Sequence, residues 1–165
     1  MKKLYILRHA KSSWEQAGIA DFQRPLNHRG LIAAPFIGEL IAGRGYLPDL
    51  ILSSPAKRAS QTASIVKESS GANAELRFDD QIYEASPQAL RQVVAELSDN
   101  IGSAMLVGHN PGIEGFIRFL TGAEEPMPTA AFASINLNID KWGDLSAGCG
   151  DIQEIIRPKE EMRSF

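Results

Sequence analysis

The sequence predicts a three-layer α/β/α sandwich with a mostly parallel sheet and an antiparallel edge. Short, continuous apolar runs alternate along the chain with longer segments whose apolar residues recur at helical spacing. Continuous apolar runs are typical of strands buried on both faces, which favours a parallel sheet covered by helices on both sides. Near the C-terminus two segments instead alternate apolar with polar residues, as half-covered strands do. At 165 residues the chain is expected to form a single domain, residues 1–165.

The first strand is predicted at residues 4–7, where the run LYIL ends at Arg8. Residues 10–29 show no regular period and contain glycine, proline and several polar residues, so a long loop is expected there. Loops of this length in a compact domain are usually functional or disordered. Residues 31–41 then repeat apolar side chains at helical spacing, which predicts a helix that stops at Gly43.

Three strand and helix pairs follow the first helix. The predicted strands are residues 50–52, 76–78 and 104–107, and the predicted helices run to about residues 69, 97 and 120. Each helix is preceded by a small polar residue and a proline, which are the residue types of an N-cap and a first helical position. These dipeptides are Ser54-Pro55, Ser86-Pro87 and Asn110-Pro111.

The C-terminal third is expected to supply the antiparallel edge. The proline-containing residues 121–129 indicate a loop. Residues 132–139 and 151–157 both alternate apolar with polar or small residues, which predicts two strands. We expect these strands to pair with each other around a turn at residues 143–150.

The composition excludes several classes of partner. The net charge of -3 argues against a nucleic-acid surface, which would be basic. No segment approaches the roughly 20 apolar residues that cross a bilayer, so no membrane partner is expected. The apolar run before Arg8 is too short for a signal peptide, which indicates a cytoplasmic location. The single cysteine, Cys149, forms no internal disulfide, and no residues have metal-ligand spacing, so neither a metal nor a cofactor is expected.

Two arginines and two histidines stand where strands end or helices begin. Arg8 and His9 follow the first strand, Arg58 lies about one turn into the helix after the second, and His109 follows the strand at residues 104–107. In open α/β sheets ligands bind beyond the carboxyl ends of the strands, where the N-termini of the following helices also point. These four side chains are therefore expected to converge on one anion site in a protein that is acidic overall.

This set of residue types suits phosphoryl transfer without a metal ion. Catalysis of phosphoryl transfer consists mainly of positioning and of stabilising charge on the phosphoryl oxygens. An arginine fork binds two phosphate oxygens and keeps its proton. A neutral imidazole can attack phosphorus and leave again when water arrives, which divides hydrolysis into two easier steps. A histidine is therefore the candidate nucleophile.

Three motifs together resemble a known family. The segments LYILRHAKS, SSPAKRASQTA and VGHNPG occur in one order across residues 4–112. They are similar to motifs of the histidine phosphatase superfamily (phosphoglycerate mutase-like), and in particular of its short SixA-type phosphohistidine phosphatase branch. The resemblance implies that His9 is phosphorylated in the intermediate, while Arg8, Arg58 and His109 hold the phosphoryl oxygens.

Further candidates are implied with less direct support from the motifs. Residues 21–26 resemble the loop that lies over the pocket in this branch, which makes Arg24 a candidate substrate-binding residue. Asp21 and Ser12 are two further candidates for substrate binding. Arg24 and Asp21 could instead form an ion pair that braces the loop. Glu84 matches the position of a carboxylate that protonates the leaving group in larger relatives, or is simply a loop carboxylate.

The preferred function is hydrolysis of a phosphorylated protein, with phosphohistidine as the expected group. The chain has no insertion long enough to form a lid, and an uncovered site can admit a protein side chain. The same site could admit small phosphoesters, so a sugar or nucleotide phosphatase is the close alternative. A non-catalytic phosphate-binding module would need a pocket without a nucleophile, whereas His9 is present. The sequence gives no indication of the oligomeric state.

Overall fold

Six strands form one mixed sheet in the computed structural model, which describes residues 1–15 and 17–162. The strand order is β3-β2-β4-β1-β5-β6; β3, β2, β4 and β1 are parallel, and β5 is antiparallel to both of its neighbours. The strands are β1 Lys2–Arg8, β2 Leu50–Ser53, β3 Glu75–Phe78, β4 Ser103–Gly108, β5 Phe132–Leu137 and β6 Gly150–Ile156. The predicted α/β class, with its antiparallel edge, is confirmed.

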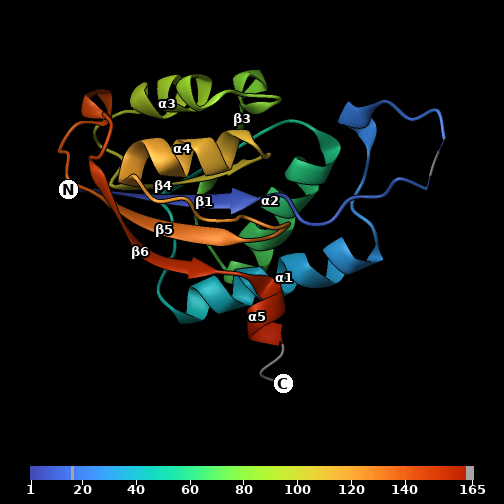
Figure 1. The fold of residues 1–165 in the computed structure, drawn as a ribbon. Helices are drawn as coiled ribbons and strands as arrows, with labels where there is room; N and C mark the ends of the chain where they lie inside the picture. Colours follow the sequence, from blue (N-terminus) through green and yellow to red (C-terminus); the bar gives the residue numbers. More distant parts are fainter. Residues whose placement is uncertain (16, 163–165) are drawn as a thin grey trace.

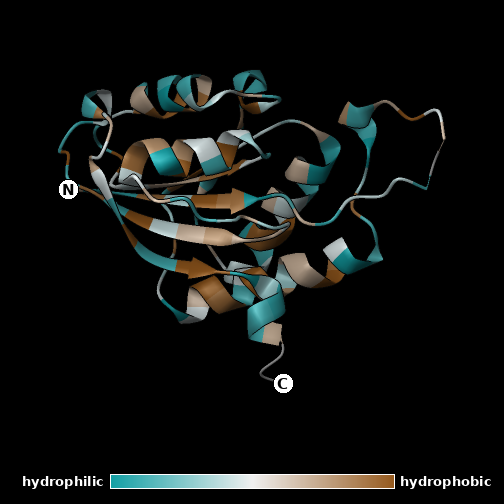
Figure 2. Ribbon diagram, viewed as in Figure 1, coloured by the Kyte–Doolittle hydropathy of each residue, from teal (hydrophilic) through white to brown (hydrophobic). Residues whose placement is uncertain are grey.

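Helices cover both faces of the sheet (Figure 1). They are α1 His28–Gly43, α2 Lys57–Ser70, α3 Pro87–Ala95, α4 Gly112–Thr121 and a short α5 Pro158–Met162. Alternate residues of β1 enter different cores: Leu4 and Ile6 pack with α3 and α4, whereas Tyr5 and Leu7 pack with α1 and α2. In Figure 2, β1 is mostly hydrophobic while the helices carry both colours. The continuous apolar run in β1 therefore reflects burial on both faces.

Strand register places the candidate histidines next to each other. Arg8 of β1 pairs with Gly108 of β4 in parallel register, so the residues that follow them, His9 and His109, leave the sheet side by side. On the other side of β4, Ser53 of β2 pairs with Val107. The residues at the C-terminal ends of β2, β4 and β1 thus lie next to one another at a single carboxyl edge of the sheet.

The first helix begins earlier than its apolar pattern indicates. Asn27 is the N-cap, and its side-chain oxygen accepts a hydrogen bond from the Gly30 amide at 2.9 Å. The helix therefore starts at His28, and the expected loop over residues 10–29 ends two residues sooner. Within this loop, Ser12 pairs with Leu26 in an isolated antiparallel bridge. The bridge therefore holds the two ends of the loop together.

Two of the three predicted helix caps are wrong. Ser86 caps α3 as expected, accepting from the Ala89 amide at 3.1 Å. Ser54 does not cap α2, which begins at Lys57, because its hydroxyl instead accepts from the Ala56 amide in a turn that keeps Pro55 outside the helix.

The helix α4 begins at Gly112, with Pro111 rather than Asn110 in the cap position. The side-chain amide of Asn110 donates to Glu114 and to the Met127 carbonyl, both at 2.9 Å, so that it joins the helix to a neighbouring loop. The side-chain oxygen of Asn110 accepts from the Glu114 amide at 3.3 Å.

The C-terminal strands pair as predicted, although β5 ends at Leu137 rather than at residue 139. The connection between them contains a 3-10 turn, Trp142–Asp144, whose Trp142 is fully buried and donates through Nε1 to the Ile101 carbonyl. Over the part of the chain that the structure describes, no helix combines the length and apolarity needed to cross a membrane.

Candidate active site

His9 lies at the tip of β1 with only 6% of its surface exposed. Its Nδ1 is 2.7 Å from the carbonyl oxygen of Ala10. A carbonyl can only accept, so Nδ1 carries the proton and donates, and the lone pair resides on Nε2. Burial first, and then the charges of Arg58, Arg8 and Arg24, lower the pKa of His9 to about 4, against the opposing effect of the hydrogen bond to Ala10. His9 is therefore a neutral imidazole at pH 7 with an unprotonated Nε2.

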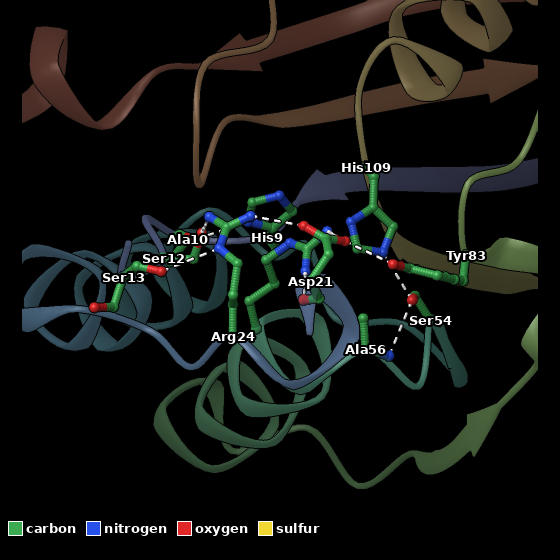
Figure 3. A network of polar contacts seen from close by, with 11 residues as sticks. His9, Ala10, Ser12, Ser13, Asp21, Arg24, Ser54, Ala56, Tyr83 and His109 are labelled. Atoms are coloured by element: carbon green, nitrogen blue, oxygen red, sulfur yellow. Dashed lines mark hydrogen bonds and ion pairs between the residues drawn. The ribbon is translucent and has the colours of Figure 1, made fainter. Parts of the chain in front are cut away.

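His109 stands beside His9, with their ring centroids 5.1 Å apart (Figure 3). Burial, followed by the neighbouring His9 and Arg58, lowers the pKa of His109 to about 3, so this ring is also neutral at pH 7. Its Nε2 lies 2.7 Å from the Oγ of Ser54. Its Nδ1 is buried and has no hydrogen-bond partner among the described protein atoms. An unpaired buried polar atom is costly, which is typical of a site built to bind a ligand.

Arg8 is the last residue of β1 and is partly buried. One terminal nitrogen, Nη1, donates to the Met127 carbonyl at 3.2 Å. Its Nε is buried without a hydrogen-bond partner in the described part of the chain. Arg8 therefore joins His109 in presenting a buried polar nitrogen that the protein itself does not pair.

Arg58 is the second residue of α2 and is held by Asp21 from the long loop. Arg58 Nη1 donates to the Asp21 carbonyl at 2.7 Å, and Nη2 donates to the Asp21 carboxylate at 3.0 Å. Arg58 is 7% exposed, and its charge lowers the pKa of both His9 and His109. The structure therefore brings together the four residues that the sequence singled out, Arg8, His9, Arg58 and His109.

Arg24 braces the loop that contains it. Its Nη1 donates to the Asp21 carboxylate at 2.8 Å, its Nε donates to the Ser13 carbonyl at 3.0 Å, and its Nη2 donates to the hydroxyl of Ser12. The guanidinium stacks on the ring of Trp14, which is 79% exposed. Of the two alternatives that the sequence left open, the ion pair between Arg24 and Asp21 is present. Direct contact of Arg24, Asp21 or Ser12 with substrate stays a prediction.

Tyr83 is a site residue that the sequence analysis missed. Its hydroxyl donates to the Asp21 carboxylate at 2.6 Å, while its ring meets His109 edge-on at 5.5 Å and Phe22 edge-on at 5.2 Å. The hydrogen bond from Tyr83 is the largest cause lowering the pKa of Asp21 to about 2, and the same bond raises the pKa of Tyr83 to about 12. Tyr83 precedes Glu84, the residue that drew attention to this segment, but a tyrosine that reaches across to a distant loop leaves no local sequence signal.

Glu84 is exposed and has a left-handed backbone, with φ of 53°. Among the described residues it makes no hydrogen bond or ion pair, so its side chain is not committed elsewhere. Its role as proton donor stays a prediction. Within residues 1–15 and 17–162, no group of three or more His, Cys, Asp or Glu side chains is arranged to hold a metal ion.

Together the fold and these side chains define a class: an α/β/α protein that gathers neutral imidazoles and guanidinium groups at the carboxyl edge of its sheet. The chain belongs to the histidine phosphatase superfamily (branch 1), whose family model matches residues 4–110.

Relatives with solved structures point to the SixA-like branch. A crystal structure of the protein assigned as phosphohistidine phosphatase SixA from Agrobacterium tumefaciens is 30% identical, with a TM-score of 0.83 over 95% of this chain and 98% of that one. The protein histidine phosphatase SixA complexed with tungstate also has a TM-score of 0.83, over 96% of this chain and 99% of that one; at 19% identity this likeness shows the fold alone. An uncharacterised protein of Mycobacterium tuberculosis is 29% identical over 87% of this chain and 94% of its own length.

Proposed function

We propose that this chain is a metal-independent phosphatase that hydrolyses a phosphorylated protein, preferably at phosphohistidine, through a phosphohistidine intermediate on His9. The observation that carries the proposal is the hydrogen bond from His9 Nδ1 to the Ala10 carbonyl at 2.7 Å. That bond leaves the Nε2 lone pair available, and the low pKa keeps it unprotonated at pH 7.

In the first step, His9 Nε2 attacks phosphorus in line with the leaving group. A bond forms between Nε2 and phosphorus while the bond from phosphorus to the leaving group breaks, and the leaving group takes that electron pair. Negative charge on the phosphoryl oxygens is stabilised by the guanidinium groups of Arg8 and Arg58. His9 becomes positively charged during attack, which is offset by the charge of the phosphoryl group it acquires.

In the second step, water attacks phosphorus from the side vacated by the leaving group. The bond between phosphorus and Nε2 breaks, its electron pair returns to the His9 imidazole, and inorganic phosphate leaves. The proton of His9 stays on Nδ1 and is donated to the Ala10 carbonyl throughout, which holds the ring in one orientation through both steps.

The demand for a proton donor depends on the leaving group. An alkoxide needs a proton as it departs, and Glu84 is the candidate donor because it is exposed and unpaired among the described residues. An imidazole is expelled more easily, so phosphohistidine makes a smaller demand on Glu84. Asp21 is unsuited to this role, because Tyr83 and the arginines keep it ionised.

Support for phosphohistidine as the substrate group comes from the Agrobacterium tumefaciens relative, which is 30% identical and is assigned as a phosphohistidine phosphatase. A small-molecule phosphomonoesterase acting on a sugar or nucleotide phosphate is the alternative, because the same chemistry at His9 serves either leaving group. A panel that contains a phosphohistidine protein and small phosphoesters decides between them. Faster turnover of the phosphoprotein supports the proposal, whereas a clear preference for one small ester contradicts it.

Rapid acid-free quenching with a labelled phosphorylated substrate tests the intermediate. We expect an acid-labile phosphoenzyme in the wild type and none in His9→Ala. His28→Ala is the matched control, because His28 is exposed at the start of α1 and belongs to no part of the site. Absence of both phosphoenzyme and turnover in the wild type would instead favour a phosphate-binding module.

A further inference from the structure

Ser54 is a completely buried residue whose hydroxyl contacts the second histidine of the site. The residue is 0% exposed, and its Oγ lies 2.7 Å from His109 Nε2. The sequence suggested that Ser54 caps α2, but α2 begins three residues later. The hydroxyl contacts both the Ala56 amide, just before the helix, and the His109 ring, as Figure 3 shows.

The hydrogen atoms around Ser54 can be assigned from its partners. Ser54 Oγ already accepts a hydrogen bond from the Ala56 amide at 3.2 Å. Among the described residues, its own hydroxyl hydrogen has one acceptor within reach, His109 Nε2. The hydroxyl therefore donates to Nε2, so Nε2 holds the lone pair and the proton of the neutral ring resides on Nδ1.

The Nδ1 proton of His109 then has no partner in the protein. Nδ1 is one of two buried side-chain nitrogen atoms of the described residues that lack a hydrogen bond, the other being Arg8 Nε. The adjacent imidazole is the His9 nucleophile, with ring centroids 5.1 Å apart. Both rings are protonated at Nδ1. His9 donates this proton to the Ala10 carbonyl, whereas the Nδ1 proton of His109 is available to an acceptor on a bound ligand.

We propose that Ser54 is a positioning residue that fixes His109 as the Nδ1-protonated tautomer, so that Nδ1 donates a hydrogen bond to an oxygen of the phosphoryl group in transfer. The inference rests on the proposed function for the identity of that acceptor. Loss of the Ser54 hydroxyl frees the His109 proton to move to Nε2, which would turn a lone pair of Nδ1 toward the phosphoryl oxygens and repel them.

Nitrogen NMR of the histidine rings tests the tautomer without reference to activity. In the ¹⁵N-labelled wild type at pH 7, long-range ¹H–¹⁵N correlations should show His109 Nδ1 as a protonated nitrogen and Nε2 as an unprotonated one. In Ser54→Ala we expect the ¹⁵N chemical shifts of the two ring nitrogens to approach each other as the tautomers mix. In Ser54→Thr, which keeps a hydroxyl, we expect the wild-type chemical shifts.

Ser53→Ala is the matched control. Ser53 is equally buried and adjacent in sequence, but its hydroxyl donates to the Ser54 carbonyl at 2.9 Å and does not contact His109. Its pattern should equal the wild type. A protonated Nε2 in the wild type, or an unchanged pattern in Ser54→Ala, would overturn the assignment.

Kinetics then test the link to catalysis. Ser54→Ala should lower kcat by about ten- to a hundredfold, by analogy with the loss of a partner that orients a metal-bound histidine, while KM changes by less. Equal loss in Ser53→Ala would mean that the effect is merely structural. If the wild type turns over no phosphorylated substrate, the proposed function fails, yet the NMR pattern still decides the role of Ser54 in holding the tautomer.

Discussion

Arg58 and Asp21 bind each other through two hydrogen bonds, one to the Asp21 backbone carbonyl at 2.7 Å and one to its carboxylate at 3.0 Å. The pair joins the long loop to α2, and the same carboxylate accepts from Arg24 and Tyr83. One loop aspartate thus orients two guanidinium groups and a phenol at the edge of the site. Asp21 therefore has the bracing role that the sequence offered as one alternative, while its contact with substrate stays a prediction.

We expect Asp21 to stabilise the fold in a pH-dependent manner. Its pKa is lowered from 3.8 to about 2, first by the Tyr83 hydrogen bond. A carboxyl with a lowered folded pKa contributes stability that is complete above its unfolded pKa and is lost as the pH falls through the folded one. Asp21→Asn should therefore be less stable than the wild type at pH 7, by about 1 kcal/mol or less because the side chain is 43% exposed. Denaturant unfolding should show the difference fading between pH 4 and pH 2; a constant difference down to pH 2 would contradict this.

Removal of the Arg58 guanidinium should impair catalysis strongly. Arg58→Ala is expected to lower kcat by about a hundredfold or more, the order for loss of one charge donor to the transition state. Lys57→Ala is the control, because Lys57 is the adjacent residue and is exposed. Steady-state kinetics should separate the two variants. A fall of less than about threefold in Arg58→Ala would mean that this arginine is misassigned.

The two site histidines should stay neutral at pH values well below the usual pKa of histidine. Burial is the main cause that lowers the pKa from 6.5 to about 4 for His9 and to about 3 for His109. NMR titration in phosphate-free buffer should find both rings uncharged at pH 6. Between pH 6.5 and 4 the unfolded chain binds protons that the folded chain does not, so stability should decline as the pH falls through this window. Titration of His9 near pH 6.5 is the result that would refute the neutral nucleophile.

Two glycines of α1 should respond oppositely to alanine. A Cβ on Gly30 would meet the Lys11 carbonyl oxygen at 2.2 Å, whereas one on Gly43 would meet nothing within 4 Å. Gly30→Ala should destabilise the protein by about 1–3 kcal/mol, the usual range for overpacking, because backbone must move. Gly43→Ala should be neutral or stabilising by up to about 1 kcal/mol, since alanine favours helix. Thermal unfolding compares the two variants. Equal shifts in melting temperature would show that the contact with Lys11 does not affect stability.

Chelators and vanadate should act differently on turnover. Arginines supply the positive charge in the proposed mechanism, so prolonged treatment with a chelator should leave kcat unchanged. Vanadate should inhibit, because it adopts the five-coordinate geometry of phosphorus under attack by His9. Activity lost to a chelator and restored by one particular metal ion would rule out the metal-independent mechanism.

The helix starts show where local patterns were sufficient. Ser86 and Ser54 both precede proline, but Ser86 caps α3 whereas Ser54 does not cap α2. The side chain of Ser86 accepts a hydrogen bond from the Ala89 amide of its own helix, so the local motif decides. The side chain of Ser54 instead accepts from the Ala56 amide in a turn and contacts His109, a residue 55 positions away.

The sequence by itself determined the α/β/α class, the order of strands and helices along the chain, and the set of charged and imidazole side chains that follow the strands. These features follow from apolar periodicity and from chain direction in parallel sheets, which are local properties. Only the tertiary structure decided that Asp21 holds Arg58, that Tyr83 joins them, and that Ser54 contacts His109. Hydrogen bonds between distant segments depend on strand register and on the path of a closed loop, and neither leaves a periodic signal in the chain.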